Sequence, residues 1–233
     1  MKTIKGIWRF SRVICYTFVC LFQAYTRFKR VDRKEKGRML RYYPTQVLKL
    51  AGVRCSYEGN VPELLHECGL TDTPPAYMVL SNHISWLDIF SLDSQLPSRF
   101  IAKAEIAKWP VFGLIAQQIG TLFINRSSKR AILRINDDIR GALCNCEAVT
   151  IFAEGTTTFG NELLPIKANF IAPACEIGAT VQPVILSYKN KGKPTKRAAF
   201  AGDVTLFGSL WNVVTMEDAE VVVHFLEPIT NTK

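Results

Sequence analysis

Residues 76–88 read AYMVLSNHISWLD, and this stretch places an imidazole, His83, five residues ahead of a carboxylate, Asp88. The apolar run at its start predicts a buried strand over residues 76–81, and the residues after it predict a helix over 86–95. Two side chains that lie five apart on one regular helix point about 140° away from each other, so they would not meet. We therefore expect His83 in the turn after the strand, and Asp88 early in the helix, facing back towards it.

A histidine that is oriented by a carboxylate is typical of a general base. Histidine is the side chain whose unperturbed pKa lies nearest to neutral pH, and the carboxylate would hold the ring in one tautomer and stabilise the imidazolium. Such a pair serves a reaction in which a hydroxyl loses its proton as it attacks. The same spacing also arises by chance, so the pair alone leaves a structural role open.

The composition indicates a packed, basic protein without an internal linker. The formal net charge of +9 over 233 residues implies an anionic partner, which is nucleic acid, a membrane surface or a phosphorylated substrate. The basic loop 189–197 has no interleaved aromatic residues, which disfavours nucleic acid. The seven cysteines show no paired spacing, so we expect reduced thiols, no metal site and a reducing compartment.

Residues 1–30 begin basic, continue with an apolar run from Val13 to Tyr25 and end basic again. The run is shorter than the roughly 20 residues of a spanning helix, and no signal-peptide cleavage site follows it. We expect a helix that anchors to or dips into a bilayer, and a single tilted span or a core helix remains the alternative. With the basic residues 27–41 facing anionic lipid, residues 1–41 form a membrane-associating segment ahead of a folded domain, 42–233.

Strands and helices alternate along this domain. Besides the strand and helix around His83, a short helix beginning at Tyr42 and helices over 106–119, 127–146, 167–177 and 207–214 are expected, with strands over 53–58, 99–103, 120–124, 149–153, 181–188 and 220–225. The alternation predicts an α/β fold with a mixed, largely parallel sheet flanked by helices. Binding sites in such sheets lie beyond the carboxyl ends of the strands. Because His83, Arg126 and Glu154 each follow a strand directly, we expect them at one edge.

Four stretches resemble the motifs of the lysophospholipid acyltransferase family, which includes 1-acylglycerol-3-phosphate acyltransferases. They are NHISWLD (82–88), GTLFINR (120–126), FAEGT (152–156) and VQPVILSY (181–188), in the order of the family's four blocks. The resemblance implies a membrane-associated enzyme that moves an acyl group from acyl-CoA or acyl carrier protein to the free hydroxyl of a lysolipid, with no further cofactor. It would lie on the cytoplasmic side of its membrane, which in a bacterium is the inner membrane.

The resemblance also implies the roles of individual residues. His83 would be the general base and Asp88 its orienting acid, and the acceptor would be bound by Arg126, Glu154, Gly155 and Thr156. Outside the motifs, Lys167 could supply further positive charge to the acceptor.

One position departs from the pattern. The family's third block commonly reads Glu-Gly-Thr-Arg, whereas this chain has Thr157 in place of the arginine. Losing that bidentate phosphate partner weakens the expectation of a phosphomonoester acceptor. The acceptor is therefore expected to be 1-acylglycerol-3-phosphate, which gives phosphatidate, with a lyso-ornithine lipid as the alternative. A thioesterase and a non-catalytic membrane-surface protein remain the rival functions.

Overall fold

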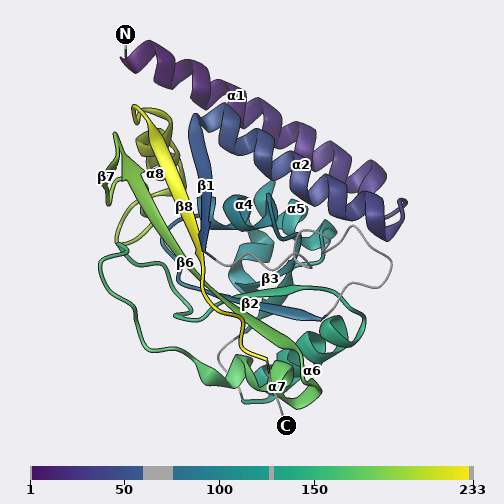
Figure 1. Cartoon of the computed structure of the whole chain (residues 1–233). Helices are drawn as coiled ribbons and strands as arrows, with labels where there is room; N and C mark the ends of the chain where they lie inside the picture. The colour runs from purple at the N-terminus through teal and green to yellow at the C-terminus, as the bar shows by residue number, and fades with distance from the viewer. Residues whose placement is uncertain (1, 60–75, 126–128, 231–233) are drawn as a thin grey trace.

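An eight-stranded sheet forms the centre of the protein, and helices cover both of its faces (Figure 1). This computed structural model describes residues 2–59, 76–125 and 129–230. The strands lie in the order β1-β8-β6-β2-β5-β3-β4, and β7 pairs with the carboxyl end of β6. Their bounds are β1 Val53–Gly59, β2 Tyr77–Ser81, β3 Arg99–Lys103, β4 Leu122–Ile124, β5 Val149–Phe152, β6 Thr180–Asn190, β7 Lys193–Pro194 and β8 Ala219–Phe225.

The sheet is mixed but largely parallel. Strand β2 runs parallel to both of its neighbours, β5 and β6, whereas β6 pairs antiparallel with β8 and β7. The predicted fold class is therefore confirmed. The parallel centre matters for function, because it brings the carboxyl ends of β2, β5 and β6 to one edge.

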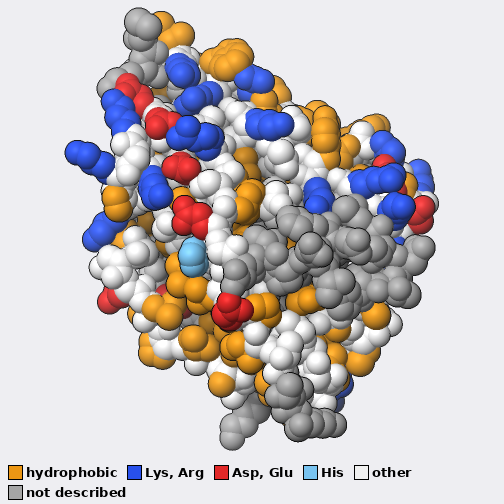
Figure 2. All heavy atoms as spheres, viewed as in Figure 1, with side chains coloured by type: hydrophobic (Ala, Val, Ile, Leu, Met, Phe, Trp, Pro, Cys, Tyr) orange, Lys and Arg blue, Asp and Glu red, His pale blue; other side chains and the backbone are white. Residues whose placement is uncertain are grey.

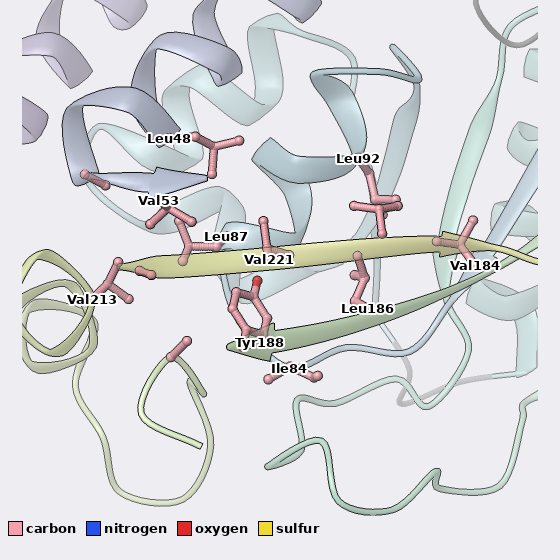
Figure 3. Close-up of a cluster of buried hydrophobic side chains, with 14 of the residues drawn as sticks. Leu48, Val53, Ile84, Leu87, Leu92, Val184, Leu186, Tyr188, Val213 and Val221 are labelled. Atoms are coloured by element: carbon pink, nitrogen blue, oxygen red, sulfur yellow. The ribbon is translucent and has the colours of Figure 1, made fainter. Parts of the chain in front are cut away.

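Two hydrophobic cores fill the two faces of the sheet. The first includes Val79 of β2 and packs beneath α2, α4 and α8, and the second includes Met78 and packs beneath α6 and α7. Neighbouring residues of one strand reach opposite cores because side chains alternate along a strand. Figure 3 shows part of the first core, with Leu87 of α4 and Tyr188 of β6 next to Val221 of β8.

The helices are α1 Lys2–Gln23, α2 Arg33–Ala51, α4 Leu87–Asp93, α5 Phe112–Gln118, α6 Lys129–Cys144, α7 Ala172–Ile177 and α8 Leu206–Val214. A π-helical turn, Ala24–Phe28, extends α1, and two 3₁₀ turns cover Ala104–Lys108 and Ala168–Phe170.

Two sequence predictions about helices are wrong. Helix α2 begins at Arg33 rather than at Tyr42, because the carboxylate of Asp32 accepts a hydrogen bond from Glu35 N at 2.7 Å and caps the helix there. The boundary placed after residue 41 thus falls inside one continuous helix. The helix expected over 106–119 is broken in two at Pro110, and Val111 has a positive φ of 63°.

Helix α1 lies along α2 at one side of the molecule (Figure 1). The inner side of α1 and of the π-helical turn that extends it buries Gly6, Val13 and Ala24. Large apolar side chains stay exposed along the outer side of both: Ile4, Ile7, Trp8, Phe18, Val19, Phe22 and Tyr25. Within the described residues no helix is both long and apolar enough to cross a membrane.

Candidate active site

The turn between β2 and α4 brings His83 and Asp88 together as predicted. His83 Nδ1 lies 2.8 Å from Asp88 Oδ2, and Asp88 is in the first turn of α4. The same carboxylate oxygen accepts hydrogen bonds from the backbone N–H groups of Ile84 at 2.7 Å and Ser85 at 2.8 Å. The carboxylate therefore shapes the turn that carries the histidine as well as holding its ring.

The second oxygen of Asp88 is held by a residue that the sequence did not single out as a site residue. The Tyr188 hydroxyl donates to Asp88 Oδ1 at 2.5 Å, and both side chains are buried. Burial, followed by the neighbouring Asp88 carboxylate, raises the pKa of Tyr188 well above its usual value, so the phenol keeps the proton that it donates. The alternation of buried and exposed residues along the strand could have predicted that Tyr188 points inward. No pattern near Tyr188 in the sequence indicates that Asp88 is its partner.

The His83 ring is positioned but still accessible. It stacks on Phe152 with ring centroids 3.8 Å apart and an interplanar angle of 7°, and its side chain is 19% exposed. Since Nδ1 donates to the buried carboxylate, Nε2 is the nitrogen with a free lone pair to accept a proton. The pair can act as a general base towards a hydroxyl that reaches this ring edge.

Glu154 lies at the carboxyl end of β5, beside the turn, as predicted. Its Oε1 accepts from His83 N at 2.9 Å and its Oε2 from Leu164 N at 3.0 Å, and the residue is buried. The sequence assigned Glu154 to the acceptor, and in the structure its carboxylate ties the loop after β5 to the backbone of His83. The loop makes a second link there, because Thr158 N donates to His83 O at 2.8 Å.

The other residues predicted to bind the acceptor are more exposed than Glu154 or lie outside the described part of the chain. Thr156 and Lys167 are exposed in the loop after β5, and Gly155 has a positive φ of 70° that suits glycine at this bend. The Thr157 hydroxyl donates to the carbonyl of Phe200. Arg126 lies outside the described residues.

Within the described residues no group of three or more His, Cys, Asp or Glu side chains could hold a metal.

Comparison with known proteins identifies the family of the chain. A family model described as Acyltransferase matches residues 55–187. A 1-acyl-sn-glycerol-3-phosphate acyltransferase of Neisseria gonorrhoeae is 43% identical over 154 residues, which are 66% of this chain and 60% of that protein. A lyso-ornithine lipid O-acyltransferase of Brucella abortus is 32% identical over 216 residues, which are 87% of this chain and 77% of that protein.

A solved structure shares the fold. The crystal structure of the 1-acyl-sn-glycerophosphate acyltransferase PlsC from Thermotoga maritima aligns with 99% of this chain and 88% of that chain, with a TM-score of 0.66 at 18% identity. The chain spans about 60% of the length of the Neisseria relative. Because the family model covers more than half of its residues, the chain belongs to the Acyltransferase family, as its motifs predict.

Proposed function

We propose that this protein transfers a fatty acyl group from a thioester to the free hydroxyl of a lysolipid. The observation that carries the proposal is the accessible His83 imidazole held at Nδ1 by the buried Asp88 carboxylate. The acceptor hydroxyl gives its proton to Nε2 while its oxygen attacks the thioester carbonyl. The C–S bond then breaks, and the leaving thiolate takes the proton from the imidazolium.

Direct attack by the acceptor is supported by the state of the nearest alternative nucleophile. Ser85, two residues after His83, is completely buried, and its hydroxyl oxygen accepts from Leu87 N at 3.4 Å. A serine in this position is out of reach of a donor thioester, so no acyl-enzyme intermediate is needed. Acyl-CoA or acyl carrier protein is the proposed donor.

We propose 1-acylglycerol-3-phosphate as the acceptor, bound through Thr156, Lys167 and Arg126. The Neisseria relative, which is named for this activity, supports it. A lyso-ornithine lipid is the second candidate, because Thr157 replaces the common arginine and turns its hydroxyl to the Phe200 carbonyl. The Brucella relative, which aligns with more of this chain, is named for that acceptor.

We also propose that the enzyme works at the cytoplasmic surface of a membrane, attached through α1. The exposed apolar residues along the outer side of α1 and the basic residues at its ends support this attachment. Such an attachment keeps the site close to an acceptor that is itself dissolved in the bilayer.

The test is the release of radiolabelled acyl groups from a thioester donor, with and without a panel of lysolipids. Transfer that requires an acceptor supports the proposal, hydrolysis without an acceptor indicates a thioesterase, and no turnover indicates a binding protein. His83→Ala is expected to lower transfer by about 10²–10⁴ while leaving the fold intact. Activity within a few-fold of the wild type would remove His83 as the base.

A further inference from the structure

We propose that the outer face of α8 and the basic strap after β6 form a second contact with an anionic lipid bilayer. The outer face of α8 means Phe207 and Trp211, and the basic strap means Lys193, Lys196 and Arg197. This inference rests on the proposed function, since it assumes a lysolipid acceptor in a membrane. The inference adds a surface that would orient the His83 turn, between β2 and α4, over that membrane.

The outer face of α8 continues the apolar face of α1. The Phe10 ring of α1 lies 6.5 Å from the ring of Phe207 and 6.1 Å from that of Trp211. Ile7 precedes Phe10 by three residues and is therefore its neighbour on the helix surface. Ile7 and Phe207 are both exposed, and Phe207 is 65% exposed. The exposed apolar surface thus extends from α1 through Phe10 onto α8.

The two helices approach closely enough to form one surface. A Cβ atom at Gly6 would lie 2.6 Å from Thr215 Cγ2 and 3.6 Å from Trp211 Cη2, so glycine allows the contact. Arg9 donates to the carbonyls of Val214 at 3.2 Å and Met216 at 3.0 Å, at the carboxyl end of α8. Helices α1 and α8 are therefore held together and would meet a flat bilayer as one unit.

The basic strap borders this apolar surface. The Arg197 guanidinium donates to Thr215 Oγ1 at 2.7 Å, and the methyl group of the same threonine faces Gly6 of α1. Lys193 and Lys196 are exposed, while Lys191 forms an ion pair with Glu217. Figure 2 shows Lys and Arg side chains, with Asp and Glu side chains among them, on the side of the molecule where Figure 1 places β7 and the start of α1. Positive charge beside exposed aromatic rings is complementary to an anionic membrane surface.

The buried side of α8 and the chain that follows the basic strap both contact the His83 turn. Trp86, three residues after His83, donates its indole N–H to Ser209 Oγ on the buried side of α8 at 3.1 Å. The chain that follows the strap donates Phe200 N to Ile84 O at 2.8 Å. A bilayer that contacts the outer face of α8 and the strap would therefore be separated from the His83 turn by one layer of structure.

The first test measures the binding of the full chain to vesicles of phosphatidylethanolamine and phosphatidylglycerol, by flotation. Phe207→Glu is expected to weaken binding about tenfold, because it puts a charge where an apolar ring would enter the interface. Leu133→Glu is the matched control, since Leu133 is 66% exposed on α6, at the opposite side of the molecule from α8. It should bind like the wild type. Equal thermal midpoints for both variants show that neither effect arises from unfolding.

The second test concerns the strap. The double change Lys193→Glu and Lys196→Glu should weaken binding to the anionic vesicles about fivefold or more and reduce its dependence on salt. Binding to phosphatidylcholine vesicles should not change. Arg134→Glu, an exposed position on α6, is the control. If the double variant binds vesicles normally but has a raised KM for an acyl carrier protein donor, the strap serves the donor and its lipid role is overturned.

These outcomes separate the surface from the activity. If Phe207→Glu floats like Leu133→Glu, α8 does not touch lipid and the inference is overturned, while acyl transfer to a soluble short-chain lysolipid still tests the enzyme. If the wild type transfers acyl groups to no acceptor, the proposed function fails, and the vesicle comparison still decides whether this surface binds lipid. We expect Phe207→Glu to keep transfer to the soluble acceptor within about twofold and to lose about tenfold with acceptor in vesicles.

Discussion

The carboxylate of Asp88 receives four hydrogen bonds, and the one from Tyr188 is supplied from another strand. In Tyr188→Phe, Asp88 Oδ1 loses a donor in a buried site, so its charge draws the imidazolium proton of His83 more strongly. We expect the acid limb of the kcat/KM profile to move to higher pH and kcat to fall about tenfold. The measurement is kcat/KM against pH.

Tyr57→Phe is the matched control for that experiment. Tyr57 is another tyrosine inside the protein, on β1, and its hydroxyl lies 2.6 Å from Ser94 Oγ, so its loss also removes one hydrogen bond. It should reduce stability without moving the pH profile. Identical profiles for Tyr188→Phe and the wild type would leave Tyr188 with a packing role only.

Thr157 is the position at which a substitution can distinguish the two proposed acceptors. Thr157→Arg adds a cation beside the end of β5, and a well-formed charge-assisted contact is worth roughly 1.5–3 kcal/mol. We expect kcat/KM for 1-acylglycerol-3-phosphate to rise about tenfold relative to lyso-ornithine lipid. Thr157→Val is the control, because it removes the bond to the Phe200 carbonyl without adding charge. A ratio that stays constant in an active Thr157→Arg enzyme places this residue away from the head group.

At the scale of elements, one side of α1 packs against the rest of the protein and the other side is exposed. Deleting residues 1–30 would remove Arg9 from the end of α8 and Val13 from the core, so the loss of membrane binding could not be separated from unfolding. Changing Phe18 and Phe22 to glutamate affects only side chains that are 57% and 64% exposed. We expect binding to anionic vesicles to fall tenfold or more, at an unchanged thermal midpoint.

Flotation of the double variant with and without vesicles is the measurement, again with Leu133→Glu as the control. If flotation is undiminished, the protein does not attach to the membrane through the outer side of α1. The next apolar candidate is the stretch around α5, where Leu114 is exposed.

At the scale of the whole molecule, a carboxyl group in the core links stability to pH. Asp93 at the end of α4 is buried, and burial raises its pKa well above the usual value, although Ser98 N donates to it at 3.1 Å. The folded protein therefore favours the neutral acid. Its contribution to stability is complete below the pKa of the unfolded chain, about 3.9, and is lost as pH rises through the folded pKa.

Asp93→Asn should remove this dependence, because an amide keeps the acceptor for Ser98 N and does not ionise. We expect the variant to gain stability relative to the wild type as pH rises from about 4.5 to 7.5. Urea unfolding at both pH values measures the two free energies. A difference between variant and wild type that is the same at both pH values would contradict the assignment of this dependence to Asp93.

The sequence alone determined the features that depend on neighbours along the chain. Strand and helix periodicity predicted the α/β alternation, and the five-residue spacing placed His83 in the turn with Asp88 in the first turn of α4, as observed. The motif order also predicted the family. These succeed because burial patterns repeat with the period of the element, and because a turn and the helix after it bring nearby residues together. The misplaced start of α2 was also local, since the cap at Asp32 is present in the sequence.

Tertiary structure alone decided which distant groups complete the site. Tyr188 reaches Asp88 from 100 residues away, and Glu154 accepts a hydrogen bond from the backbone N–H of His83. These contacts follow from the strand order, in which β2 lies between β5 and β6, and from the register of each pair. Order and register are set by packing both cores at once, so no local pattern specifies which buried side chains will meet.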